Sequence, residues 1–151
     1  MPLEILCERL DIQSIGELET EGFEAALLTD AVKSVGAILV AKGQERRRRR
    51  FSIGHELGHF LIPAHRMPPG VPLLCSAEQL RCLDVKDQDR RRRMEAEANR
   101  FAALLLMPPP ILRAELQRIR RPQISDIVYL ADLFDVSKDA MARAYADYSR
   151  E

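Results

Sequence analysis

The feature that most constrains the fold of this chain is the pentapeptide His55-Glu56-Leu57-Gly58-His59. Residues four apart on an α-helix lie one turn apart on the same face, so His55 and His59 would present their rings together. Two imidazole nitrogens at that spacing suit an ion such as Zn²⁺, and Glu56 would supply a general base for an attacking water. The alternative is a buried amphipathic helix whose histidines are hydrogen-bonded core residues. The motif therefore predicts a helix here and, on it, a candidate metal site.

A second helix is predicted over residues 94–107, where apolar side chains recur at three- and four-residue steps before Pro108 to Pro110 end the pattern. A catalytic zinc site needs three protein ligands and one open position, so this helix should supply the third ligand. Glu95 and Asn99 share a face, whereas Glu97 is rotated by about 200° from Glu95. We therefore predict Glu95 as the ligand and Asn99 as the group that holds the far nitrogen of a ligating histidine. Glu97 is expected in solvent or paired with a neighbouring arginine.

These two segments resemble the ImmA/IrrE-type metallopeptidases of bacteria and their mobile elements. The resemblance rests on residues 50–61, which contain the HExxH motif, and on residues 95–108, which read E-x-E-A-N-x-F-A-x-x-L-L-M-P. The first segment would fit many zincins, whereas the second is characteristic of this family. Residues 1–40 match it only in general character.

The resemblance implies that His55, His59 and Glu95 bind zinc and that Glu56 is the general base, the same residues that the spacing selects. It implies one Zn²⁺ per chain, although two histidines and a carboxylate also suit Mn²⁺ or another divalent ion. It further implies a class of substrate, because members of the family cleave helix-turn-helix repressors, often encoded by an adjacent gene, and thereby relieve repression in a stress or mobile-element response.

The predicted fold class is α+β. A zincin-like metallopeptidase core is expected, with a small antiparallel or mixed N-terminal sheet, the HExxH helix and the second metal-ligand helix, followed by a C-terminal helical hairpin. An edge strand of that sheet would pair with an extended substrate. The expected elements of the N-terminal part are a helix over residues 3–15, strands over 23–28 and 35–40, and the start of a third strand over 47–53.

The C-terminal part resembles a helix-turn-helix in outline, with helices over residues 125–134 and 138–148 and Ser137 as N-cap of the second. Phosphate contacts would require positive charge on these helices. We therefore predict that residues 111–151 form a helical segment packed on the metallopeptidase domain, residues 1–110, and that they do not read DNA. The acidic residues that argue against DNA binding are Asp132, Asp135, Asp139 and Asp147.

Positive charge is concentrated in two arginine runs, residues 46–50 and 90–93, each of which leads into one of the predicted metal-binding helices. One interpretation is a basic rim around the site that steers an acidic partner or contacts nucleic acid carried by that partner. The other is a solvated arginine-rich surface with some side chains paired to carboxylates. The pattern favours the second interpretation.

The connection between the two metal-binding helices, residues 63–89, is long and rich in proline, and we expect it to be mobile and to act as a lid or a docking segment. His65 at its start is expected on the surface, or as a group that stabilises the transition state. Cys75 and Cys82 lie in the same connection. Together with Cys7 they are expected to be buried or incidental thiols, since no metal-binding spacing links them.

The N-terminus has neither a basic region nor an apolar stretch of the kind found in signal peptides, so a cytoplasmic location without membrane contact is expected. Three functions fit the sequence: a zinc endopeptidase that cuts a cognate helix-turn-helix repressor, a metal-bound but non-proteolytic repressor-binding regulator, and a DNA-binding accessory factor. Glu56 favours the first over the second, because a binding module needs no base. The acidic C-terminal helices argue against the third, and the oligomeric state stays open.

Overall fold

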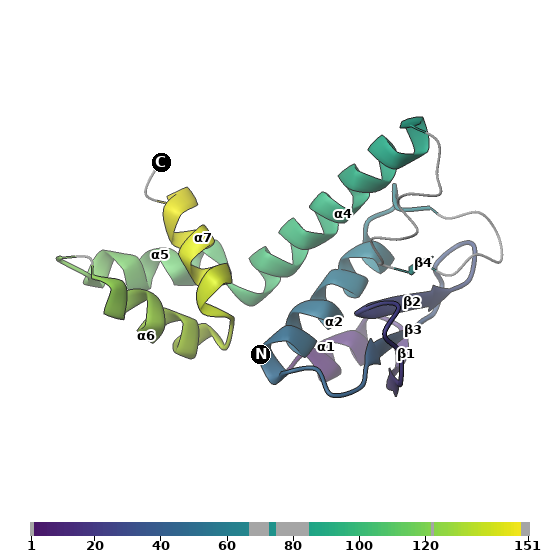
Figure 1. Ribbon diagram of the computed structural model, residues 1–151, viewed down its shortest axis with the longest axis horizontal. Coiled ribbons are helices and arrows are strands. Elements are labelled where there is room, and N and C mark those ends of the chain that lie inside the picture. The colour runs from purple at the N-terminus through teal and green to yellow at the C-terminus, as the bar shows by residue number, and fades with distance from the viewer. Residues whose placement is uncertain (1, 67–72, 75–84, 122, 149–151) are drawn as a thin grey trace.

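The computed structural model describes residues 2–66, 73–74, 85–121 and 123–148 and has an α+β fold (Figure 1), in agreement with the predicted fold class. A small mixed sheet lies on one side of the HExxH helix, and a long helix lies on the other side. The elements in chain order are α1 (Leu3–Arg9), β1 (Ile12–Leu18), β2 (Ala25–Thr29), β3 (Gly36–Ala41), α2 (Arg46–Leu61), β4 (Leu73–Leu74), α4 (Val85–Leu106), α5 (Pro109–Arg118), α6 (Ile124–Phe134) and α7 (Lys138–Tyr148).

The sheet has the strand order β1-β3-β2-β4, so β3 is a central strand. It pairs in parallel with β1 and antiparallel with β2, and β2 pairs antiparallel with β4. Side chains along β3 alternate between buried and half-buried, as expected for a strand with one face on the core. Both β2 and β3 pack on α2, which therefore lies between the sheet and α4 (Figure 1).

The structure corrects the predicted N-terminal helix over residues 3–15. The helix ends at Arg9, Asp11 adopts a left-handed conformation with φ 65°, and residues 12–18 form β1. The apolar residues Leu3, Leu6 and Leu10 suggested the helix, but pairing with β3 determines the conformation of the residues that follow. The two strands predicted over 23–28 and 35–40 are confirmed as β2 and β3, each shifted by one or two residues.

The predicted third strand over residues 47–53 is wrong, because α2 already begins at Arg46. The side chain of Glu45 caps this helix and accepts hydrogen bonds from the backbone N–H groups of Arg47 and Arg48. Such a cap satisfies amide groups that have no partner within the helix, and arginine is itself a good helix former. The arginine run is therefore the first turn of the HExxH helix.

Two glycines of α2 allow α4 to approach closely. A Cβ atom added at Gly58 would lie 3.0 Å from Cδ1 of Phe101, and one added at Gly54 would lie 3.4 Å from Cβ of Ala102. Because Gly54 and Gly58 are one turn apart, they form a continuous strip without side chains along the contact. This close packing brings the part of α4 that precedes Phe101 against the histidines of α2.

The three C-terminal helices cluster at the end of α4 (Figure 1). The predicted hairpin is confirmed, since α6 and α7 pack on each other, and the hydroxyl of Ser137 accepts a hydrogen bond from the backbone N–H of Ala140. Buried residues from both predicted parts, including Leu57 and Leu130, belong to one core cluster. The predicted division at residue 110 stays a prediction.

The first arginine run forms ion pairs with carboxylates on both sides of α2. Asp135 contacts Arg46 at 2.6 Å, Arg50 at 3.1 Å and Arg47 at 3.6 Å. Asp135 follows the last residue of α6 and has a left-handed conformation with φ 55°. The remaining pairs are Arg47 with Asp132, Arg48 with Glu24, and Arg49 with Glu4 and Glu17. The run therefore fits the interpretation of a surface paired to carboxylates.

Replacing Asp135 with Asn is expected to lower the free energy of unfolding by about 1 kcal/mol, because the three arginines lose a shared carboxylate in a partly buried network. Asn tolerates the left-handed backbone, so the substitution tests charge without adding strain. Thermal unfolding at low salt and in about 1 M NaCl measures the effect, which should shrink at high salt. Asp139→Asn, which removes the exposed pair with Arg143, is the control and should change little. Equal losses in both variants would contradict a special role for Asp135.

Cys7 is buried in the core at 1 % exposure. Burial, followed by the charge of Glu4, raises the pKa of its thiol from 9.0 to about 11. Because the thiolate is the reactive form, this higher pKa predicts that Cys7 is alkylated at pH 8 roughly 100-fold more slowly in the folded than in the unfolded chain. The unfolded thiol loses its proton first as the pH rises, so the fold should lose stability between pH 9 and 11. Iodoacetamide labelling of the folded and the unfolded chain, followed by peptide mass analysis, measures the two alkylation rates. Equal rates would contradict the expected protection of the thiol.

Candidate metal centre

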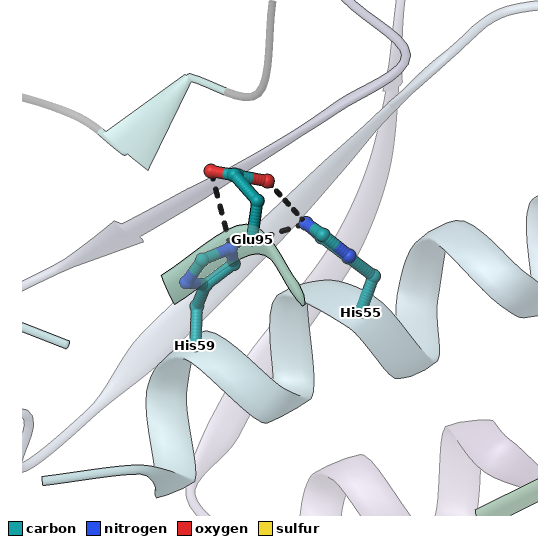
Figure 2. A group of neighbouring side chains, drawn as sticks. All are labelled: His55, His59 and Glu95. Atoms are coloured by element: carbon teal, nitrogen blue, oxygen red, sulfur yellow. Dashed lines mark hydrogen bonds and ion pairs between the residues drawn. The ribbon is translucent and has the colours of Figure 1, made fainter. Parts of the chain in front are cut away.

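The helix α2 presents His55 and His59 on one face, where their Nε2 atoms lie 3.1 Å apart (Figure 2). Both residues are buried, His59 completely. Their position follows from the helical repeat, since residues four apart are neighbours on a helix surface. The predicted helix through the HExxH motif is thus confirmed, with both imidazoles directed to the same place.

Glu95 reaches this place from α4. One of its carboxylate oxygens lies 3.1 Å from Nε2 of His55 and the other 3.6 Å from Nε2 of His59 (Figure 2). The three potential ligand atoms all lie within 4.8 Å of one another, and among the described residues this is the one group of three that could hold a metal ion. The prediction that Glu95 rather than Glu97 meets the histidines agrees with this arrangement.

Glu95 and the two histidines shift one another's pKa values. Burial alone would raise the pKa of Glu95, but hydrogen bonds and charges of His55 and His59 together lower it well below its usual range. Burial likewise opposes ionisation of His55, yet contacts with Glu95, the charge of Glu56 and a contact with Asn99 raise its pKa overall. The pKa of His59 is lowered by burial. The three groups are therefore electrostatically coupled.

The donor set fits a metal ion of the zinc type. Two imidazole nitrogens and one carboxylate oxygen form the ligand combination of many catalytic zinc sites, in which a fourth position stays open to water or substrate. The same donors also accept other divalent ions, so the identity of the metal is not determined by the ligands. The three residues that could hold it are His55, His59 and Glu95.

Glu56 follows His55 on α2 and is fully buried. Its charge contributes to the raised pKa of His55, which indicates that the carboxylate lies near that ring. A carboxylate beside a metal site is suited to proton transfer, because it can accept a proton from one partner and donate it to another. The role of Glu56 as the base stays a prediction.

Each histidine of the pair also has a contact at its far ring nitrogen, Nδ1. Nδ1 of His55 lies 2.9 Å from Oδ1 of Asn99, the contact that the predicted role of Asn99 requires. Nδ1 of His59 lies 3.0 Å from Nδ1 of His65. Nε2 of His65 in turn lies 2.9 Å from a carboxylate oxygen of Glu97.

One expectation about these outer residues is corrected. His65 is fully buried rather than on the surface, because the chain folds back after α2 and inserts this ring behind His59. Both of its nitrogens face His59 and Glu97, so its placement gives no support to a contact with the transition state. Glu97 is exposed to solvent, as expected, and one of its carboxylate oxygens also pairs with His65. The expected mobile lid, Cys75 and Cys82 fall in a segment of which residues 67–72 and 75–84 lie outside the described residues.

Lys33 is a further residue at the site that the sequence did not indicate. It lies in the connection between β2 and β3 with φ 55°, and its Nζ donates hydrogen bonds to the backbone carbonyls of His59 at 2.5 Å and Ile62 at 2.8 Å. Burial, with the charge of Arg66, lowers the pKa of Lys33. A cation at the C-terminus of a helix stabilises its free carbonyls, so Lys33 fixes the end of α2 that carries His59. No local sequence pattern marks such a contact.

Comparison with known protein families gives one match. The family Peptidase_M78, described as the IrrE N-terminal-like domain, matches residues 7–145 and so covers most of the chain. The chain belongs to this family. Membership in the IrrE N-terminal-like family confirms the resemblance seen in residues 50–61 and 95–108, and it identifies the chain as a member of a peptidase family.

A search of curated proteins found no match to this member of the IrrE N-terminal-like family. In the part of the chain that the structure describes, no helix combines the length and apolar character needed to cross a membrane.

Proposed function

We propose that this chain is a zinc-dependent endopeptidase. The observation that carries the proposal is the convergence of His55, His59 and Glu95, with Glu56 adjacent, in a chain of the IrrE N-terminal-like family. In the proposed zincin-like arrangement, these three residues hold one metal ion and Glu56 is the base. Zn²⁺ suits the donor set best, although Mn²⁺ or another divalent ion could replace it.

The proposed mechanism assigns a separate task to each group. When bound, the metal ion would supply a Lewis acid that polarises the scissile carbonyl and acidifies the attacking water. Glu56 accepts the proton of that water and then delivers it to the nitrogen of the peptide fragment that leaves as an amine. Asn99 accepts a hydrogen bond from Nδ1 of His55 and so keeps its Nε2 directed at the site.

The proposed substrate is a helix-turn-helix transcriptional repressor, encoded by an adjacent gene, whose cleavage relieves repression in a stress or mobile-element response. The support is the family resemblance of residues 50–61 and 95–108, not a surface feature of this chain. The proposal includes action in the cytoplasm and no direct contact with DNA. Two acidic residues, Asp132 of α6 and Asp135 at its end, pair with the arginine run, which fits a packing role for α6.

Co-production of the chain with candidate repressors tests the proposal. Repressor fragments are identified by mass spectrometry, and bound metal is measured in the native protein, in Glu56→Gln and in the control Asp139→Asn. Cleavage by the native and control proteins but not by Glu56→Gln, with about one metal ion in each, would support the peptidase. An intact repressor that nevertheless co-purifies with the metal-bound native protein would instead favour a non-proteolytic repressor-binding regulator.

A further inference from the structure

The far nitrogens of the two metal-site histidines have different acceptors. His55 faces the amide oxygen of Asn99, which can only accept a hydrogen bond. His59 instead faces a second imidazole, that of His65, nitrogen to nitrogen at 3.0 Å. An imidazole can donate or accept at this position, so the contact is favourable only when one of the two nitrogens carries a proton and the other does not, which either ring can satisfy.

The carboxylate of Glu97 determines which of the two nitrogens carries the proton. An ionised carboxylate only accepts, so Nε2 of His65, 2.9 Å away, must carry the proton and donate it to Glu97. A neutral His65 then has a bare Nδ1, which can accept a hydrogen bond from Nδ1–H of His59. With its proton on Nδ1, His59 has a free electron pair on Nε2, the atom that faces Glu95. Each hydrogen bond from Glu97 to His59 therefore has one donor and one acceptor, and Nε2 of His59 is left able to bind a metal ion.

The surroundings of His65 hold it in this position. Its side chain is fully buried, and its backbone N–H donates to the carbonyl of Ile62 at 3.1 Å. Lys33 donates to the same carbonyl and to that of His59, so the turn between the two histidines is fixed from the sheet side. Only Glu97 of this set is largely exposed, with 57 % of its side chain accessible.

We propose that His65 and Glu97 are positioning residues that fix the tautomer and the ring orientation of His59. The inference rests on the metal site of the proposed function. Outer partners of this kind fix the orientation of a ligating histidine, and their loss typically weakens metal binding by about 10–100-fold. His65 thus accepts the Nδ1 hydrogen bond of His59, as Asn99 accepts that of His55. Unlike Asn99, His65 can accept this bond only while Glu97 keeps the proton of His65 on Nε2.

Zinc affinity measured by competition with a chromophoric chelator tests the proposal. Glu97→Leu removes the acceptor at an exposed position where folding should survive, and it is expected to weaken zinc binding about 10-fold. Glu97→Gln keeps an oxygen acceptor and should retain most of the affinity. Asp139→Leu, a change of the same kind on α7, should have no effect. His65→Leu should weaken binding at least as much as Glu97→Leu, whereas His65→Asn, which restores an acceptor, should recover part of the loss.

Nitrogen-15 spectra of the histidine rings provide a readout that a packing role would not change. The chain has 3 histidines, so each ring can be assigned in the zinc-loaded protein. We expect the proton on Nδ1 in His55 and His59 and on Nε2 in His65. In Glu97→Leu, His65 should lose this preference. A native His65 with its proton on Nδ1, or equal zinc affinity in all variants, would overturn the inference alone, whereas a native protein that binds no metal would overturn the proposed function as well.

Discussion

Replacing Glu56 with Gln is expected to lower the rate of peptide cleavage by at least about 10²–10⁴-fold, the contribution usual for a positioned acid or base. The amide has nearly the same shape but cannot accept the proton of the attacking water. Because Glu56 is fully buried, an isosteric change is needed, since a smaller residue would leave a cavity and lower stability as well. Single-turnover cleavage of a repressor or a model peptide measures the effect.

The metal content of the variant separates loss of the base from loss of the site. Glu56→Gln should bind about one metal ion per chain, as the native protein should, and should unfold at a similar temperature. A variant that keeps both metal and full activity would show that another group carries the proton. A variant that loses the metal would place Glu56 among the ligands, contrary to the assignment made here.

Replacing Glu95 with Gln is expected to weaken zinc binding by more than roughly 10–100-fold. A loss of that size is typical when the replaced residue contacts a ligand rather than the metal itself. The substitution keeps the shape of the side chain but removes the negative charge that lies between the two Nε2 atoms. It also removes the partner that raises the pKa of His55, so the site should lose its preference for a cation. Zinc titration against a competing chelator measures the loss.

Glu97→Gln is the matched control for Glu95→Gln, because it makes the same chemical change two residues along α4. It should cost far less affinity, since the amide oxygen of Gln can still accept the hydrogen bond of His65. The reverse result would show that Glu97 is the ligand and would overturn the assignment based on helix faces. Circular dichroism of both variants would establish that α4 remains folded.

The core of the candidate site was predictable because it depends on helix periodicity alone. The spacing of His55 and His59 fixes their common face, and the spacing of Glu95 and Asn99 does the same on α4. The structure brings Glu95 to both histidines and Asn99 to the far nitrogen of His55. A repeat of 3.6 residues was enough to infer which side chains of each helix face the other.

The partners of His59 were not predictable in the same way. His65 lies beyond the end of α2, so its burial depends on how the chain turns at Ile62 and on the contact of Lys33 with that turn. Lys33 comes from a connection in the sheet, 26 residues before His59. Contacts of this kind are set by tertiary packing, and no local pattern of polar and apolar residues records them.

The error at the N-terminus has a related cause. Residues 12–18 form a strand because β3 offers a parallel partner, and the residues that make up β3 begin only at Gly36. A parallel pair cannot be closed by a tight turn, so the signal of a hairpin was absent between β1 and β3. The strands β2 and β3, which are neighbours in sequence and pair antiparallel, were both predicted as strands.

The strip of Gly54 and Gly58 has a consequence for which ions the site accepts. A methyl group at Gly58 would require its neighbour Phe101 to move by a few tenths of an ångström. The radii of divalent ions differ by similar amounts, and metal–ligand distances vary by only about 0.2 Å within one ion type. Since Glu95 and the two histidines belong to different helices, we expect ion selectivity at the proposed site to depend partly on two residues that coordinate nothing.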